Sequence, residues 1–534
     1  MAEQTAYVGT RPQLFVDGYL VSKRHGLTEQ THQMVKHPGP VLKAEAAWER
    51  PEVAGLAGAV NAIYDEDEGL FKLWYYARGT FTAGTLPGVP SLSCYATSRD
   101  GINFERPELG LTEFNGSTAN NILNDDIGPG HGMLDCEEMA GIEPDDMRFK
   151  STRWLGFDDN GYGGHGVTFS PDGLRWRTYE GNPVIRGLEH GDSITSAKLR
   201  DSYYRLDDPP GFPSGKYALF PKVHVTLGPW RRRCIGMCTS EAVNNRTPFV
   251  EWSTPLLALA PDQRDDEMTK ERLATTPSPE LLVYNHPDDH RCEFYGMVAF
   301  RHGDVMLGML WIFDAAFECT RLGGRNQQAL VDVQLTSSRD LVHWHRAGNR
   351  EPIITRGDPE SFDSAMIFYH SFPLTVGDEW WVYYCGHATA HSSISYADPV
   401  VRDRFLEDVR AGRRQFPAIG LAKIRTEGFI SLDAGAEGGW LATRPLRAGG
   451  GQLAVNANVA AGGELRVEVQ AASGEPLPGY ALADCTPITG DGVRQAVRWG
   501  DRVGDSSWSG RDVRLKFELR DAELYAFQFS EPAG

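Results

Sequence analysis

One phrase recurs five times along this chain: a serine or acidic turn followed by an aromatic or apolar residue. Clear copies occupy residues 98–104, 170–176 and 338–344, and looser copies run over 240–252 and 425–430. Successive copies lie roughly 70 to 98 residues apart, an interval long enough for four strands and their turns. Self-similarity at this interval is typical of a β-propeller, and five copies predict five blades.

The acid in each clear copy is expected to shape the turn rather than to take part in chemistry. Asp100, Asp172 and Asp340 each stand two residues after a serine, where aspartate accepts backbone hydrogen bonds in an Asx turn. Near the N-terminus, residues 14–17 have the pattern of a strand. We expect this strand to pair with the last blade and close the ring, which leaves no long unpaired edge.

The pattern changes after Leu432. Glycine-rich stretches at 437–439 and 448–451 indicate linkers, and the strands that follow alternate apolar and polar residues. Such alternation with turn signals predicts a small β-sandwich. The chain is therefore predicted to be all-β, with a five-bladed β-propeller over residues 1–435 and a β-sandwich over residues 445–534. The sandwich is expected to pack on the propeller, and sugar binding is its alternative role.

Composition excludes several classes of partner. The formal net charge is −19, which repels phosphate backbones and anionic membranes, so we expect neither nucleic acid nor a membrane as partner. No apolar run approaches the length of a membrane span, and the first residues carry no export signal. Eight cysteines are scattered without zinc-site spacing, which is typical of free thiols in a reducing cytoplasm. We expect a cytoplasmic protein without an organic cofactor or a catalytic metal, and both a structural cation on the axis and homo-oligomerisation are left open.

Acidic residues recur on the strands expected to face the central axis. Blade three offers Asp192, blade four Glu293 and blade five Asp363. Carboxylates that converge on one funnel repel one another, which raises some of their pKa values and lets one act as an acid while its neighbour stays ionised. Glycoside hydrolysis uses this arrangement, because one carboxyl protonates the leaving oxygen and another attacks or activates water.

We expect Asp192 and Glu293 to be the catalytic pair and Asp363 to tune their charges. Phe294 and Tyr295 beside Glu293 should raise its pKa and suit it to be the general acid. Asp192 would then be the nucleophile or base. The residues expected to bind the substrate are Asn61, Asp135, His190, Arg301 and His387.

Four phrases, at 14–20, 97–101, 332–335 and 419–422, resemble those of known enzymes. With the five-blade plan and the axial acids, the chain resembles the superfamily of glycoside hydrolase families 32, 43, 68 and 130. It is most similar to an uncharacterised branch described as family 32 N-terminal-domain-like. The resemblance implies a propeller glycosidase.

The chain departs from family 32 at its catalytic motifs. Asn61 is followed by Ala62 where that family has its nucleophilic aspartate, and blade two lacks an Arg-Asp-Pro motif. Glu293 follows Cys292 instead of preceding a cysteine. The fructosidase triad therefore cannot be carried over residue by residue.

These observations predict a glycoside hydrolase that cleaves a small neutral glycan or glycoside, with a furanoside such as a fructoside or arabinoside as one option. Two alternatives stay open. A glycan phosphorylase would need phosphate and a cluster of Arg, Lys or His at the funnel. A noncatalytic carbohydrate-binding propeller would bind sugar without turnover.

Overall fold

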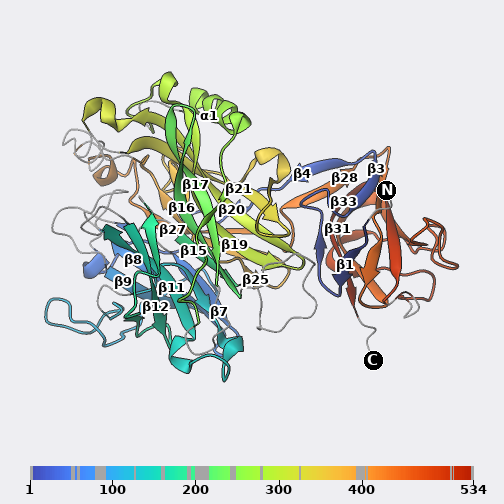
Figure 1. The fold of residues 1–534 in the computed structure, drawn as a ribbon, viewed down its shortest axis with the longest axis horizontal. Coiled ribbons are helices and arrows are strands. Elements are labelled where there is room, and N and C mark those ends of the chain that lie inside the picture. The colour runs from blue at the N-terminus through green and yellow to red at the C-terminus, as the bar shows by residue number, and fades with distance from the viewer. Residues whose placement is uncertain are drawn as a thin grey trace.

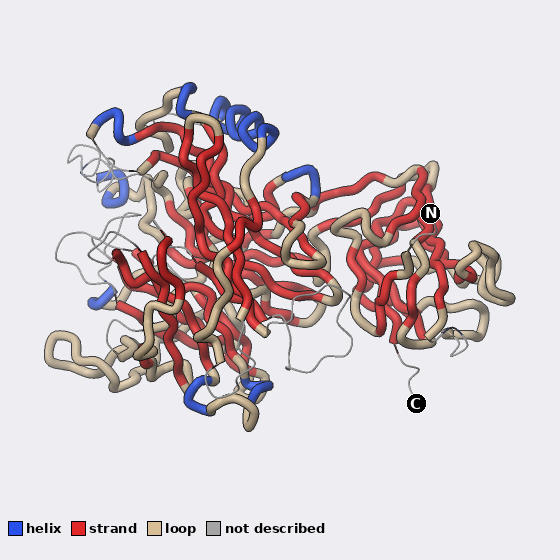
Figure 2. Tube along the Cα trace, in the orientation of Figure 1, coloured by secondary structure: helices blue, strands red, loops and turns tan. Residues whose placement is uncertain are grey.

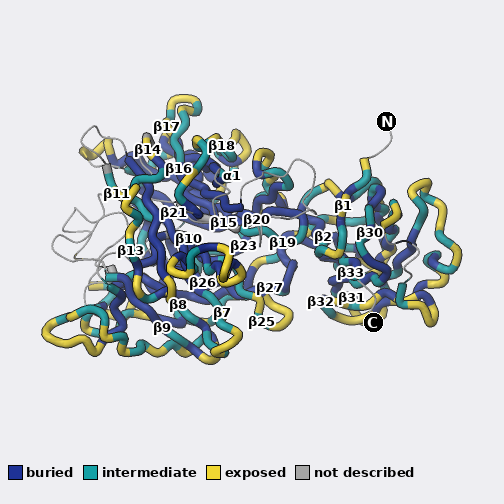
Figure 3. The backbone as a smooth tube through the Cα atoms, turned by 60° about the horizontal axis from the view of Figure 1, so that its bottom comes forward, coloured by how far each residue is buried: buried dark blue, intermediate teal, exposed yellow. Residues whose placement is uncertain are grey.

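The computed structural model forms two lobes of unequal size that meet along one seam (Figure 1). It describes residues 4–49, 55–56, 60–78, 92–124, 128–157, 163–188, 194–198, 216–240, 248–276, 281–323, 326–391, 403, 407–504, 508 and 510–530. Strands make up most of both lobes, and the few helical turns lie on the outside of the larger one (Figure 2). Buried residues follow the strands, whereas exposed residues gather in the connecting loops (Figure 3). The predicted all-β class is confirmed.

The larger lobe consists of antiparallel meanders that follow one another along the chain, and a parallel pairing of β21 with β24 joins the last two into one sheet. Their strands are β7 (Asn61–Asp65), β8 (Leu70–Arg78) and β9 (Leu92–Ser98); β10 (His131–Asp135), β11 (Phe149–Phe157), β12 (Gly163–Ser170) and β13 (Arg177–Thr178); β15 (Ile194–Lys198), β16 (Tyr217–Leu227), β17 (Trp230–Thr239) and β18 (Leu256–Leu259); β19 (Arg291–His302), β20 (Val305–Glu318), β21 (Gln327–Ser338) and β22 (Trp344–Arg346); and β24 (Met366–Phe368), β26 (Glu379–His387) and β27 (Ala418–Arg425). Shorter strands beside them are β5 (Val35–Lys36), β6 (Gly55–Leu56), β14 (Ile185–Leu188), β23 (Pro352–Ile354) and β25 (Leu374–Val376).

Neighbouring meanders share hydrophobic cores. Each core draws on two meanders, and one core joins the last meander to the first. Pairs of residues that share a core are Trp74 with Phe149, Phe169 with Leu219, Phe220 with Phe294, Val298 with Val382, and Tyr383 with Leu73. Phe372 packs against two of these cores, one shared by the second and third meanders and one by the fourth and fifth. It therefore lies where the meanders converge.

The repeated phrase forms the same turn in its three clear copies. Ser170 Oγ accepts a hydrogen bond from the backbone N–H of Gly173 at 2.9 Å. Asp172 Oδ1 accepts from two further backbone N–H groups at 2.9 and 2.8 Å. The same bonds recur at 98–103 and 338–343, so the predicted Asx turns are confirmed.

These turns also join one meander to the next. Trp74 Nε1 donates to the carbonyl of Gly173 at 2.7 Å, and Tyr383 donates its hydroxyl to the carbonyl of Gly101 at the same distance. Gly173 has φ +74°, and a Cβ there would come within 2.8 Å of the Trp74 ring. The glycine therefore serves both the left-handed turn and the close approach of the tryptophan.

The smaller lobe contains the C-terminal strands together with the first strands of the chain. Its strands are β1 (Ala6–Gly9), β2 (Gln13–Leu14), β3 (Val21–His25), β4 (Thr28–Thr31), β28 (Ile430–Ala434), β29 (Gly439–Thr443), β30 (Leu446–Ala448), β31 (Gln452–Ala471), β32 (Gly490–Ala496) and β33 (Asp512–Ser530). One core of its own fills this lobe.

The N-terminal strands differ from the prediction in their partner. β2 pairs with β33, and Phe15 is buried in the core of the smaller lobe, whereas Leu14 and Val16 pack in a core with residues of the last meander. The segment that does pair with the last meander is β5, through Lys36 opposite Ala422 of β27. Residues 6–31 therefore belong with the C-terminal strands, because alternation identifies a strand but does not specify which sheet it joins.

Helix α1 (Gln263–Thr275) lies between β18 and β19 and was not predicted. A capping box fixes its start, because Asp262 and Asp265 each accept the other's backbone N–H. Its face toward β20 is polar: Thr269 and Arg272 both bond the buried carboxylate of Asp314, at 2.6 and 2.7 Å.

A buried carboxylate, Glu427, bridges the two lobes. His302 at the end of β19 contacts Glu427 Oε1 at 2.9 Å. From the smaller lobe, Arg494 donates to both carboxylate oxygens at 2.6 and 2.8 Å, and Asn456 donates at 3.0 Å. The seam is therefore held by a charged group that water does not reach, since the Glu427 side chain is 0% exposed.

Candidate active site

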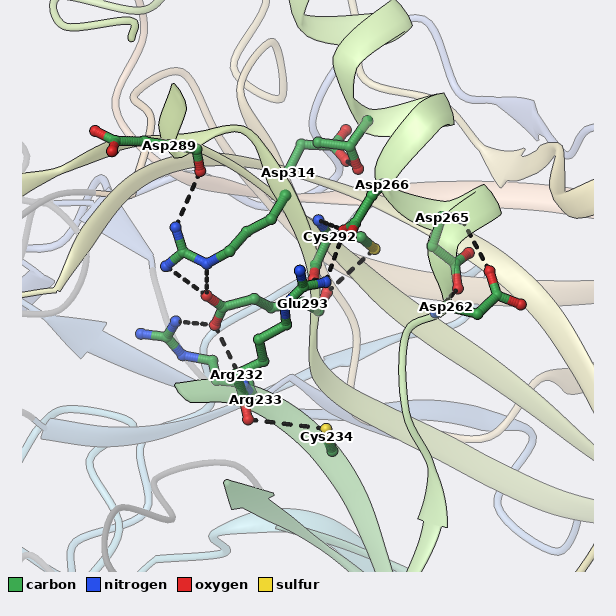
Figure 4. A network of polar contacts seen from close by, with 12 residues as sticks. Arg232, Arg233, Cys234, Asp262, Asp265, Asp266, Asp289, Cys292, Glu293 and Asp314 are labelled. Carbon is green, nitrogen blue, oxygen red and sulfur yellow. Dashed lines mark hydrogen bonds and ion pairs between the residues drawn. The ribbon is translucent and has the colours of Figure 1, made fainter. Parts of the chain in front are cut away.

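Glu293 stands near the start of β19, opposite Phe313 of β20. Two arginines hold its carboxylate (Figure 4). Arg233 Nη1 lies 2.5 Å from Oε2 and its backbone N–H donates to the same oxygen at 3.3 Å. Arg291 Nε donates to Oε1 at 2.8 Å. The Glu293 side chain is 1% exposed, so its charge is balanced by protein groups rather than by water.

This pairing reverses the pKa direction predicted for Glu293. Burial alone would raise the pKa of its carboxyl, but the charges and hydrogen bonds of Arg233 and Arg291 outweigh burial and hold the pKa below its usual value. A lowered pKa disfavours the protonated form that a general acid needs, so this arrangement does not support the predicted role of Glu293. The aromatic neighbours and Arg291, two residues before Glu293 on β19, were visible in the sequence, whereas Arg233 comes from β17 of the preceding meander.

The arginines continue into a wider polar network. Arg233 Nη1 also donates to the side-chain oxygen of Gln327 at 2.7 Å. Gln327 in turn donates to Glu318 at 3.2 Å, and Glu318 pairs with Arg291. The guanidinium groups are thus fixed from several sides, which orients them before any ligand arrives.

Aromatic side chains lie against the same cations. Tyr295 follows Glu293 by two residues, and Lys222 Nζ lies 4.1 Å from the centre of its ring. Arg233 lies 5.5 Å from that ring and 4.6 Å from the ring of Phe313. Phe368 packs beside Tyr295 at 5.4 Å between ring centres. The arrangement combines flat apolar faces with cationic hydrogen-bond donors.

His391 completes this group and was not predicted. Its Nδ1 lies 2.9 Å from the backbone carbonyl oxygen of Gln327, and its Nε2 lies 3.4 Å from the Tyr295 hydroxyl. The histidine lies at the end of the described segment 326–391, beyond β26, and no sequence pattern links it to β19. Only the bridge between Ala329 and His391 brings it to this position.

Asp363 lies apart from the Glu293 group. Its carboxylate bonds Lys36 Nζ at 2.7 Å, the Tyr384 hydroxyl at 2.8 Å and the Ser361 hydroxyl at 2.7 Å. Lys36 is on β5, the outermost strand of the last meander. Among the described residues, no contact joins Asp363 to Glu293, so the structure gives no support to the expected tuning of Glu293 by Asp363.

The predicted substrate-binding residues are spread over the larger lobe. Asn61 bridges two meanders through the carbonyl of Gly130 and the N–H of Met133, at 3.0 and 2.9 Å. Asp135 forms a two-bond pair with Arg148, at 2.8 and 2.9 Å. Both side chains thus have structural partners.

Arg301 lies away from the Glu293 group, whereas His387 lies beside it. Arg301 is eight residues beyond Glu293 on β19, a separation of roughly 26 Å along a strand, and it donates to the carbonyl of Gly303. The structure therefore does not bring Arg301 to the Glu293 group. His387 packs edge-on against Phe368 at 5.6 Å, so the structure brings it to the aromatic side of the Tyr295 group.

Asp192 and His190 lie outside the described residues. Among the residues that are described, no group of three or more His, Cys, Asp or Glu side chains is arranged to hold a metal ion. All eight cysteines are buried. In the part of the chain that the structure describes, every helix is too short or too polar to span a bilayer.

A cavity of about 610 Å³ lies in the seam between the lobes. Asp17 and Tyr19 line it from one side, and Arg339, His343 and Arg346 line it from the other. Arg339 pairs with Asp17 at 2.8 Å across it. The predicted site residues do not line this cavity, so it is separate from the Glu293 group.

No protein-family model matches the chain, and no curated protein matches it. Solved structures similar to it include a glycoside hydrolase at 12% identity and TM-score 0.40, covering 73% of this chain and 92% of that chain. A β-1,2-mannobiose phosphorylase from Listeria innocua is similar at 11% identity and TM-score 0.38, covering 73% and 96%. A GH32 β-fructofuranosidase from Bombyx mori is similar at 12% identity and TM-score 0.36, covering 91% and 96%. These similarities are too low to assign an activity.

Proposed function

We propose that the larger lobe is a five-bladed β-propeller and that its active site lies at the end of the axis where β19 begins. Shared cores between successive meanders, including the last with the first, support a closed ring. Phe372, which packs against cores from both sides of the ring, supports a filled centre below the site. In a propeller the first strand of each blade faces the axis, which puts Glu293 and Tyr295 on the innermost strand of blade four.

We infer that the protein is a glycoside hydrolase acting on a small neutral glycan or glycoside, with furanosides among the substrates to be tried. One observation carries this proposal: Lys222 and Arg233 lie against the ring of Tyr295, beside Phe313 and Phe368. Aromatic faces pack on the apolar side of a sugar ring, and adjacent charged groups bond its hydroxyls. Glu293 stays ionised and holds the arginines in place. Asp192 remains the candidate for the reacting carboxylate.

The test is a panel of aryl pyranosides, aryl furanosides and fructo-oligosaccharides, incubated with the wild-type protein and with Lys222→Met. Methionine keeps the apolar stem of Lys222 and removes its charge. We expect turnover of at least one glycoside and a loss of about tenfold or more in kcat/KM for the variant, as for one lost charged contact. No turnover across the panel contradicts the proposal, and binding without turnover favours a noncatalytic carbohydrate-binding propeller.

A glycan phosphorylase is the second candidate, and the cationic group favours it specifically. Lys222, Arg233 and Arg291 all lie within contact distance of Tyr295 or Glu293. Three cations at one site can bind a phosphate oxyanion, although Glu293 neutralises part of their charge. Turnover that requires inorganic phosphate and releases a sugar phosphate would establish the phosphorylase. Phosphate-independent release of free sugar would establish the hydrolase.

A further inference from the structure

We propose that Tyr295 and His391 form a nucleophile–base pair, so that the enzyme works through a covalent glycosyl–tyrosine intermediate. The proposal rests on the proposed function for its substrate class. It makes Tyr295 the nucleophile, a role for which the sequence analysis considered only carboxylates. The pair is oriented by a third group, as activated nucleophiles require.

The hydrogen-bond partners of His391 fix its tautomer. The backbone carbonyl of Gln327, 2.9 Å from Nδ1, can only accept a hydrogen bond, so Nδ1 carries the proton in the neutral ring. Nε2 then presents a lone pair, and it faces the Tyr295 hydroxyl at 3.4 Å. The phenol is therefore the donor, and His391 is placed to take its proton. This contact is long for an O–H···N bond, as catalytic hydrogen bonds commonly are before substrate binds.

Two cations stabilise the phenolate that would form. Lys222 Nζ lies 4.1 Å from the centre of the Tyr295 ring and Arg233 lies 5.5 Å from it. Lys222 is 1% exposed, so water screens this interaction little. Positive charge beside the ring favours the ionised phenol over the neutral one.

Gln327 couples the base to the arginine. Its side-chain oxygen accepts from Arg233 at 2.7 Å, and its backbone carbonyl accepts from His391 at 2.9 Å. Arg233 is itself fixed by Glu293. Glu293 is thus a positioning residue: it holds the cation that faces Tyr295, which explains an ionised and fully buried carboxylate two residues from the nucleophile.

The chemical step balances with these two groups and one carboxyl, for which Asp192 is the candidate. Tyr295 Oη forms a bond to the anomeric carbon as the bond from that carbon to the leaving oxygen breaks. The phenol proton passes to His391 Nε2, and the carboxyl protonates the leaving oxygen, which departs as an alcohol. Water then attacks the anomeric carbon as the bond from that carbon to Tyr295 Oη breaks; the carboxylate takes a proton from the water, and His391 returns the phenol proton to Tyr295.

A tyrosine-reactive probe tests the pair without knowledge of the sugar. Phenylmethanesulfonyl fluoride forms a sulfur–oxygen bond to an activated phenol and releases fluoride. The full-length protein is incubated with the reagent, and peptide mass spectrometry measures the labelling rate of each tyrosine. Tyr384 is the internal control: it is also buried, but burial first and the neighbouring Asp363 second raise the pKa of its phenol.

We expect Tyr295 to label at least tenfold faster than Tyr384, and His391→Asn to slow Tyr295 labelling at least tenfold. Asparagine keeps a donor for the Gln327 carbonyl and lacks the Nε2 base. Failure of Tyr295 to label, or an unchanged rate in a folded His391→Asn variant, overturns the pair. Glycoside turnover that survives complete labelling of Tyr295 also overturns it and leaves the hydrolase in place. Selective labelling without turnover of any glycoside supports the pair and removes the proposed function.

Discussion

Replacing Glu427 by glutamine should weaken the seam between the lobes. The carboxylate meets His302 from the larger lobe and Arg494 and Asn456 from the smaller one. Burial alone would raise the pKa of Glu427, but the hydrogen bonds from His302 and Arg494 outweigh it and lower the pKa from 4.5 to about 2. That difference corresponds to about 3 kcal/mol of stability at neutral pH. Glutamine keeps the shape of the side chain and removes this contribution.

The sign of the pH dependence follows from the lowered pKa. The stabilisation is fully present well above the unfolded-state pKa of 4.5 and is lost as the pH falls toward the folded-state value of about 2. Linkage gives a loss of about 1 kcal/mol between pH 6 and pH 3.5. The stability difference between wild type and Glu427→Gln should therefore shrink by that amount over this interval.

Urea unfolding of the two proteins at pH 6 and pH 3.5 measures this difference. Glu464→Gln is a matched control, because Glu464 pairs with Arg466 and Arg520 on the surface of the smaller lobe. Such exposed pairs contribute about 0 to 1 kcal/mol. A Glu427→Gln protein as stable as wild type at pH 6, or a difference that does not change with pH, would refute this account of the seam.

Three further substitutions test other parts of the account. Gly173→Ala should lower the free energy of unfolding in urea by at least about 1 kcal/mol more than Gly69→Ala does. Both glycines have positive φ, but only Gly173 lies against the Trp74 ring. Equal losses would show that this contact is unimportant. Asp363→Asn should lower stability by about 1 to 3 kcal/mol through its lost lysine pair and leave kcat within a few-fold of wild type, so a large loss of turnover would return Asp363 to the active site. Asp192→Asn should lower turnover about 10²-fold or more without changing the melting temperature, and near-wild-type turnover would exclude Asp192 as a reacting carboxylate.

The repeating features of the fold were predictable because their causes are local. The turns built on Ser170 and Asp172 need only neighbouring residues, and the same bonds appear in each clear copy. The sequence does not show which sheet a strand joins. Residues 14–17 were expected to pair with the last blade, yet β2 pairs with β33, some 500 residues away in the chain, while Leu14 and Val16 pack in a core with the last meander. Helix α1 carried a signal, the Asp262–Asp265 capping box, within a polar segment that showed little apolar periodicity.

The sequence pointed to Glu293 but not to the electrostatics around it. The aromatic residues that follow Glu293 suggested a raised pKa. Arg233, the charge that lowers this pKa most, comes from another meander and is set by three-dimensional packing, whereas Arg291 was in view two residues earlier in the sequence. His391 was invisible for the same reason, since its contact with Tyr295 spans 96 positions of the chain.

A crystal structure of the protein soaked with the sugar released from a cleaved glycoside tests the central claim most directly. The account predicts a sugar ring packed against Tyr295, with Lys222 or Arg233 in contact with it, at the end of the axis where β19 begins. Sugar bound instead in the seam cavity beside Asp17 and Tyr19, with the surroundings of Tyr295 unchanged, would contradict it.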